Sequence, residues 1–247
     1  MNRTTTRSYL FVSLRRFAAL AWVAVAVQAA AVQAVTIPYG NFFGATVDYL
    51  GVEEIVDPGN GLFGAPTIAG DALDFNPQGF SASANGGSTR INDSNLRFGV
   101  MAKTGNGISG LYLSEAGDVT LTGQGFGLAA VTTAIFVEIT EVNGNTPVSI
   151  NDDVSLPGFY QSGWFGDAFI DFGPALAANG ITGFVSKIFV SLDNTLTAAS
   201  SANTSSFIQK KDADGLIITI ETEEIPEPSS IVSALIALAL GGFAIRR

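Results

Sequence analysis

The chain has 247 residues, no cysteine and no histidine, and 22 acidic against 12 basic side chains, which gives a formal net charge of −10. The missing cysteines exclude a disulfide framework, and the missing histidines exclude Ser-His-Asp and Cys-His catalysis and the usual zinc, copper and haem sites. An enzyme would have to work with carboxylates, Tyr, Lys or Ser-Lys, and no pair of carboxylates stands out. We therefore expect a protein without catalytic residues.

Residues 1–34 have the parts of a secretory signal peptide. Four arginines form a basic stretch without an acid, residues 17–27 are apolar without interruption, and small residues follow. The tripeptide Val-Gln-Ala that ends at Ala34 fits a signal-peptidase site, so we predict export and cleavage after Ala34, with Ala29 or Ala31 as alternatives. A retained N-terminal membrane anchor is the other interpretation, although the apolar stretch is short for one.

Residues 35–224 predict a single all-β domain, a length that suits one sizeable core. Short runs alternate apolar with polar side chains, contain β-branched and aromatic residues, and are separated by glycine-rich turns, which is the pattern of strands. In chain order the predicted strands are residues 96–100, 118–122, 135–140, 169–172, 187–192 and 216–221. We therefore predict a β-sandwich with a jelly-roll-like arrangement.

Five Asn-Gly pairs predict tight turns, because both residue types tolerate a positive φ. These pairs stand at 60–61, 85–86, 106–107, 143–144 and 179–180. The clearest hairpin runs from residues 134–142 through Asn143-Gly144 into residues 146–150. Residues 174–179 predict a short helical turn. The small, polar stretch 195–206 predicts a loop exposed to solvent and a candidate for O-linked sugar.

Two acidic clusters have some features of a calcium site. Asp212 and Asp214, followed by Gly215, begin with the spacing of a calcium loop, and hard cations favour several oxygen ligands in a tight turn. The rest of that loop is missing, so a plain turn before a strand is the other interpretation. Asp152 and Asp153 either share a cation or cap a loop, because adjacent carboxylates repel one another unless solvent or metal separates them.

An aromatic cluster near residue 160 offers a candidate ligand surface. Tyr160 and Trp164, the latter followed by Phe165, would form a platform on which a sugar ring stacks. Aromatic clusters of this kind also occur in hydrophobic cores, and both interpretations stay open at this point.

The C-terminal segment, residues 225–247, has three parts in a fixed order. Pro226-Glu227-Pro228 interrupts regular structure, residues 231–245 are apolar without a charge, and Arg246-Arg247 ends the chain. As a helix the apolar run measures about 22 Å at a rise of ~1.5 Å per residue, whereas a hydrocarbon core is ~30 Å thick. The run is therefore short for a permanent anchor, and basic residues favour the cytoplasmic side.

This tail resembles the PEP-CTERM sorting signal of exported bacterial proteins. The resemblance rests on Pro226, Glu227 and Pro228 together with Arg246 and Arg247. It implies that an exosortase, a membrane-embedded cysteine peptidase-transpeptidase, cuts near the Pro-Glu-Pro and passes the protein to the envelope surface or an extracellular matrix. The stretch from residue 187 to 221 also resembles a region of other such proteins, and it brings no catalytic motif.

The two end segments change the charge of what remains. Residues 35–245 hold six basic residues and all 22 acids, a net charge of about −16. Such a surface excludes nucleic acid as a partner and favours solubility, cations and hydrated polysaccharide. We expect a structural or adhesive protein of the cell surface or matrix. The alternatives are a calcium-assisted carbohydrate-binding module and, more distantly, a carboxylate-dependent glycosidase.

Intact-mass spectrometry of the protein recovered from its native cells tests both end segments. We expect a mature species that begins at Val35 and ends near residues 226–228, because both ends carry processing signals. A mature species that keeps Arg246-Arg247 would show that the tail is a retained anchor.

Overall fold

The fold is taken from a computed structural model that describes residues 34–56, 61–145, 150–160 (backbone only), 162–211 and 214–226. The predicted signal peptide, apart from Ala34, and the predicted sorting segment beyond Pro226 lie outside the described residues. Strand β1 begins at Val35, directly after the predicted cleavage site, and the cleavage itself stays a prediction. Within the described residues no helix is both long enough and apolar enough to span a bilayer.

The described residues form an all-β fold with a single short helix, α1. Its bounds are Phe172–Ala178. The strands are β1 (Val35–Phe43), β2 (Val47–Val56), β3 (Thr67–Ala69), β4 (Ala72–Phe75), β5 (Ser81–Asn85), β6 (Thr89–Ala102), β7 (Asn106–Gly123), β8 (Gly127–Val142), β9 (Ile150–Tyr160), β10 (Trp164–Asp171), β11 (Val185–Ser200), β12 (Thr204–Lys210) and β13 (Leu216–Glu224).

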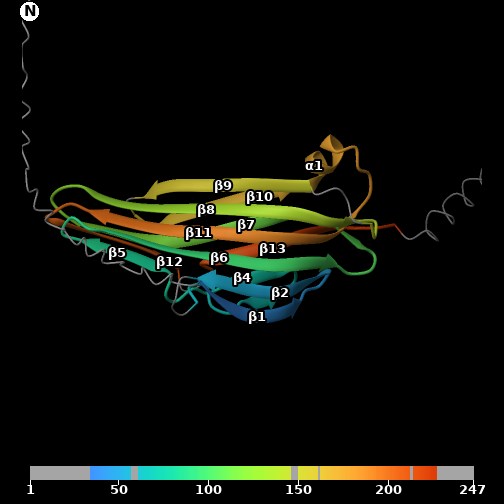
Figure 1. Cartoon of the computed structure of the whole chain (residues 1–247), viewed down its shortest axis with the longest axis horizontal. Helices are drawn as coiled ribbons and strands as arrows, with labels where there is room; N and C mark the ends of the chain where they lie inside the picture. The colour runs from blue at the N-terminus through green and yellow to red at the C-terminus, as the bar shows by residue number, and fades with distance from the viewer. Residues whose placement is uncertain (1–33, 57–60, 146–149, 161, 212–213, 227–247) are drawn as a thin grey trace, which may run out of the picture. The chain divides into compact units, whose positions relative to one another are not determined.

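The strands pair antiparallel and lie in two layers (Figure 1). The first sheet has the order β1-β2-β6-β11-β8-β9. In the second sheet, β10 lies along one side of β7, while β12 and β13 lie end to end along its other side. Strands β5 and β4 extend that side, with β3 at the edge. Val185 of β11 pairs with Ile108 of β7 and connects the two sheets.

The inward-facing side chains of both sheets make one hydrophobic core. Along β11, Val190, Leu192, Asn194 and Leu196 are fully buried, and the side chains that alternate with them face outward, as the period of a strand requires. The largest buried side chains include Tyr49, Phe63, Phe75, Phe80, Phe98 and Phe172. The sandwich predicted from the sequence is confirmed at this level, and the jelly-roll-like connectivity stays a prediction.

The predicted strands fall within observed ones, with one exception at an end. Residues 96–100, 118–122, 135–140, 187–192 and 216–221 lie in β6, β7, β8, β11 and β13 respectively. The run 169–172 ends β10, and Phe172 already begins α1. Alternation over short runs was enough to locate these strands because one face of each is packed against the core.

The prediction of an exposed loop at residues 195–206 is wrong. Strand β11 continues to Ser200, β12 begins at Thr204, and Leu196 and Ala198 are buried. The stretch alternates buried and partly exposed residues, but its alanines, serines and threonines contribute little to hydropathy. Small side chains on the inner face are nevertheless compatible with close packing of the sheets.

The Asn-Gly pairs have different outcomes. Asn143 and Gly144 adopt φ of 49° and 77° and turn β8 toward β9, as predicted. Asn106-Gly107, by contrast, lies inside β7, and the positive φ belongs to the preceding Gly105 at 85°. Asn179 ends helix α1, which confirms the helical turn but not a hairpin there. A tight turn is fixed by which strands pair, so the dipeptide alone misplaces it.

The buried carboxylate of Glu54 fastens the loop after β2 to the first sheet. Its oxygens accept hydrogen bonds from the backbone N–H of Leu62 at 2.6 Å, from that of Phe63 at 3.2 Å and from the Ser94 hydroxyl at 2.6 Å. The Tyr39 hydroxyl also donates to it. This anchoring holds the Phe63 ring against Phe80, with centroids 5.1 Å apart. A buried carboxylate is tolerated here because the four donors of Tyr39, Leu62, Phe63 and Ser94 bind it.

Replacing Glu54 by Gln should destabilise the fold by about 2 kcal/mol. The amide nitrogen of Gln cannot accept a hydrogen bond, so the donors around it would lose part of the acceptor that the carboxylate provides. Urea unfolding measures the change. Glu53→Gln is the matched control, since the neighbouring Glu53 pairs in register with Arg97 and is only partly buried. A change below about 0.5 kcal/mol in Glu54→Gln would contradict the anchoring role.

Candidate functional site

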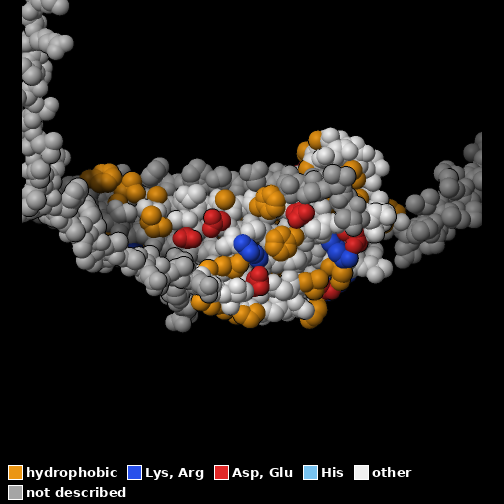
Figure 2. Space-filling model, viewed as in Figure 1, with side chains coloured by type: hydrophobic (Ala, Val, Ile, Leu, Met, Phe, Trp, Pro, Cys, Tyr) orange, Lys and Arg blue, Asp and Glu red, His pale blue; other side chains and the backbone are white. Residues whose placement is uncertain are grey.

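The outer face of the first sheet exposes large apolar side chains on several of its strands, and Ile91 of β6 is one of them. Leu50 of β2 is 36% exposed, Phe136 of β8 is 41% exposed and Phe189 of β11 is 37% exposed. Figure 2 shows this face, where hydrophobic side chains lie beside acidic and basic ones. Exposed aromatic groups on a regular sheet face mark a surface suited to contact with another molecule.

A gap in the side chains separates Leu50 from Phe189. Both pair in register with Gly99 of β6, which carries no side chain. A Cβ built at Gly99 would meet its nearest neighbours, a Leu50 backbone oxygen and Cβ, at 3.7 and 3.8 Å, which is ordinary van der Waals contact. Packing therefore does not require a glycine here. The notch between Leu50 and Phe189 is about two strand spacings wide, or ~9.6 Å.

Polar side chains line the same face next to the notch. Arg97, two residues before Gly99, donates from Nε to the Asn95 Oδ1 at 2.7 Å. Asn95 in turn donates from Nδ2 to the Ser191 hydroxyl at 3.0 Å. These bonds hold the Nε end of the Arg97 guanidinium in place. Among the described residues no acid lies within ion-pair distance of Arg97, so its terminal nitrogens have donors to offer to a ligand.

The arrangement pairs a stacking surface with a fixed set of hydrogen-bonding groups. Ser191 lies between Arg97 and Phe136 in the register of the sheet, and Asp193 follows one row further along. Apolar ring faces and adjacent donors and acceptors together suit a ligand that is itself amphipathic, with C–H faces and hydroxyl edges. Regular strands hold these groups in place, so binding would cost little ordering of the protein.

Sequence reasoning did not select these residues, although a signal was present. Phe136 stands on the polar side of the alternation in residues 135–140, opposite Ile135, Val137 and Ile139. A phenylalanine on the solvent side of a strand departs from the pattern. Leu50, Gly99 and Phe189 come from other strands, and only the register of β2, β6 and β11 brings them together.

The predicted aromatic platform takes a different form. Trp164 is only 4% exposed, and its ring lies 5.2 Å from the Lys210 ammonium, measured from the ring centroid. It cannot serve as a surface platform, and the core interpretation describes it. Tyr160 pairs in register with Ala129 at the end of β9, and its side chain lies outside the described residues. Phe165 is exposed on β10, in the second sheet.

The calcium sites stay predictions. Asp152 and Asp153 belong to β9, whose side chains are outside the description, and Asp212 also lies outside it. Asp214 adopts a φ of 54°, and its N–H donates to the Asn76 Oδ1 at 3.2 Å, which fits a turn before β13. Within the described part of the chain, no group of three or more acids is close enough to hold a metal ion.

The sorting residues are largely beyond the description. Pro226 is exposed just after β13, whereas Glu227, Pro228, Arg246 and Arg247 lie outside the described residues. The sorting signal and its processing therefore stay predictions.

Comparisons with known proteins place the chain in no family. No family model matches it, and no curated protein matches it. Among solved structures it is similar to TmCBM61 in complex with β-1,4-galactotriose, at 13% identity over 76% of this chain and 88% of that one, with a TM-score of 0.22. It is also similar to a family 16 carbohydrate-binding module, at 11% identity over 62% of this chain and 77% of that one, with a TM-score of 0.22. A third similar structure is endoglucanase 3 of Trichoderma harzianum from family GH12, at 10% identity over 77% of this chain and 98% of that one, with a TM-score of 0.20. Scores of this size assign neither a fold family nor a function.

An acidic pair on the second sheet has a consequence for pH. Burial raises the pKa of Asp74, and repulsion from Asp214 raises it further. Because the folded state then holds the proton more tightly than the unfolded state, ionised Asp74 destabilises the fold at neutral pH. The penalty is relieved as the pH falls through the raised pKa.

We therefore expect Asp74→Asn to raise the melting temperature at pH 7, and to lose this advantage as the pH falls below ~3.9, the ordinary pKa of Asp, because the pKa of Asp74 is raised above that value. Thermal unfolding in EDTA measures the difference, since EDTA removes any cation between the two acids. Asp193→Asn, at an exposed site on the other sheet, is the control. A lower melting temperature for Asp74→Asn at pH 7 would contradict the repulsion.

Proposed function

We propose that this protein is exported to the cell surface or extracellular matrix and there holds neutral polysaccharide on the outer face of its first sheet. The observation that carries the proposal is the placement of Phe189 and Phe136 beside the hydrogen-bonded row of Asn95, Arg97 and Ser191. This role is structural or adhesive and involves no reaction.

A sugar ring presents an apolar C–H face and a rim of hydroxyls, and both have counterparts on this surface. The C–H face packs on the ring of Phe189, and the Gly99 notch leaves room for the edge of the sugar. The Arg97 guanidinium and the Asn95–Ser191 pair supply donors and acceptors to the hydroxyls. Binding at one such face is weak, and many copies along a polymer would raise the overall avidity.

The charge of the chain selects among polysaccharides. With a net charge of about −16 over residues 35–245, the protein repels anionic polymers at low ionic strength. A neutral polymer experiences no such repulsion. Calcium is not required by this mode of binding, so a calcium-assisted mode would need the acids of the predicted clusters in addition.

The proposal also includes export and sorting, and the support for these two steps comes from the sequence alone. A signal peptidase would act after Ala34, and the Pro226-Glu227-Pro228 tail resembles the signal that an exosortase reads. The apolar run 231–245 would hold the protein at the membrane until that step. Release to the outside would then bring the sheet face into contact with matrix polymers.

Two substitutions on the face test the binding role by different means. Phe189→Ala removes the stacking ring and should weaken binding about tenfold, the equivalent of ~1.4 kcal/mol. Gly99→Ala adds a Cβ that meets the backbone only at van der Waals distance, partly fills the notch and should also weaken binding. Affinity electrophoresis in gels that contain a neutral glucan, galactan or mannan measures both. Phe165→Ala, an exposed phenylalanine on the second sheet, is the matched control and should bind as wild type.

Failure of the wild-type protein to be retarded by any of these polymers would overturn the proposal. So would equal retardation of wild type, Phe189→Ala and Gly99→Ala in a polymer that does bind, because the ligand would then lie on another surface.

A further inference from the structure

An ion pair lies inside the core, between the two sheets. Lys210 of β12 and Glu115 of β7 have side chains that are 0% and 1% exposed, and the Lys210 Nζ is 2.6 Å from the Glu115 Oε2. From the first sheet, Asn194 donates to the same oxygen from Nδ2 at 2.8 Å. Thr133 donates to the other oxygen, Oε1, at 2.6 Å and fixes the plane of the carboxylate.

Lys210 lies in largely apolar surroundings, between two aromatic rings. The Nζ lies 5.8 Å from the centroid of the Phe80 ring and 5.2 Å from that of Trp164. Burial lowers the pKa of Lys210, and the carboxylate of Glu115 only partly offsets that effect. A desolvated lysine with a neighbouring base is an activated nucleophile.

The amide of Asn194 shares its carboxylate partner with Lys210. Its Nδ2 and the Lys210 Nζ bind the same carboxylate oxygen, so the two nitrogens are no farther apart than the sum of the two hydrogen-bond lengths. The amide carbonyl oxygen, Oδ1, is buried and has no hydrogen-bond partner among the described residues. A buried acceptor without a partner is unfavourable, so a donor that reached Oδ1 would be stabilising there.

We propose that Lys210 and Asn194 form an intramolecular isopeptide bond, with Glu115 as the catalytic acid and base. Glu115 takes a proton from the Lys210 ammonium, and the neutral Nζ attacks the Asn194 Cγ while Glu115 donates toward Oδ1. The Cγ–Nδ2 bond then breaks, and the remaining amine proton passes by way of Glu115 to the leaving nitrogen. The products are one secondary amide, one molecule of ammonia and a protonated Glu115. No oxidant, metal or cofactor enters the balance.

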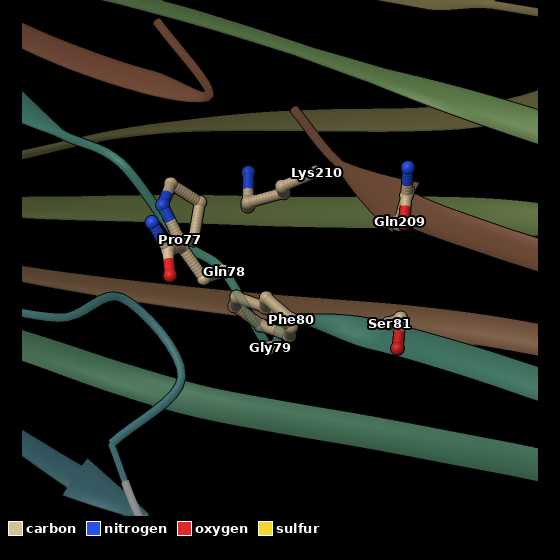
Figure 3. Close-up of a pocket in the computed structure, with 7 residues that line it drawn as sticks. All are labelled: Pro77, Gln78, Gly79, Phe80, Ser81, Gln209 and Lys210. Carbon is tan, nitrogen blue, oxygen red and sulfur yellow. The ribbon is translucent and has the colours of Figure 1, made fainter. Parts of the chain in front are cut away.

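The product suits this position better than the reactants do. A buried ion pair carries a desolvation penalty from both charges, whereas the product cluster is neutral and Glu115 can donate to the new amide oxygen. The bond also joins β11 of the first sheet to β12 of the second across the core, in a chain without cysteine. A pocket of about 20 Å³ borders Lys210 and Phe80 (Figure 3), room enough for one molecule the size of ammonia.

Trypsin mapping of the full-length protein tests the bond directly. Unmodified chain is cleaved after Lys187 and after Lys210, which releases fragment 188–210 at its full mass. The isopeptide blocks cleavage after Lys210, so we expect fragment 188–211, lighter than calculated by about 17 Da for the lost ammonia. A succinimide at Asn194 has the same mass loss but leaves cleavage after Lys210 intact, and so counts against the proposal.

Two other results would overturn the proposal. Fragment 188–210 at full mass would show an ordinary ion pair. A loss of about 18 Da with Lys210 joined to fragment 104–187 would make Glu115 the acyl donor instead of Asn194. Glu115→Gln keeps the shape but removes the acid and base, and should restore cleavage after Lys210 at full mass. If that variant does not fold, the mass of the wild-type fragment still shows whether the isopeptide bond is present. This result does not depend on whether the protein binds polysaccharide.

Discussion

The constraint on which this fold depends is that two antiparallel sheets must bury one face each against the other while carboxylates lie between them. Glu54 and Glu115 are both fully buried, and each is surrounded by donors from more than one element. An unsatisfied buried charge would cost more than the packing around it could offset. Glu115 of the second sheet accepts its hydrogen bonds from Thr133 and Asn194 of the first, so it favours the registry in which these groups meet. This requirement adds specificity to an otherwise non-directional hydrophobic core.

The same registry determines what the outer face presents. Strand residues alternate between the two faces, so fixing Leu192 and Leu196 in the core also fixes Phe189, Ser191 and Asp193 outside. The outer face of a sheet packed on one side is free to carry function. On the first sheet it carries aromatic rings, a glycine notch and a hydrogen-bonded polar row, all held on regular strands and not on loops.

The covalent and the binding proposals concern opposite faces of the same strands. β11 carries Phe189 on the outside and Asn194 on the inside. A protein that holds a polymer outside the cell is exposed to mechanical load and cannot rely on disulfides if it has no cysteine. An amide between β11 and β12 would keep the two sheets together at the strand that carries part of the proposed binding surface. The buried location of the reacting groups would also protect that amide from water.

The sequence by itself determined the strand periods and the β8–β9 turn at Asn143-Gly144, because these depend on local conformation. The processing segments at the ends stay predictions from linear motifs. It could not place residues 195–206, whose small side chains give weak alternation, nor Lys210, which beside Lys211 resembles a solvated pair. Only the pairing of β12 with β7 turned Lys210 inward to Glu115, and only the register of β2, β6 and β11 set Leu50, Gly99 and Phe189 in one row. Such contacts join residues distant in the chain, and local periodicity carries no information about which strands will be neighbours.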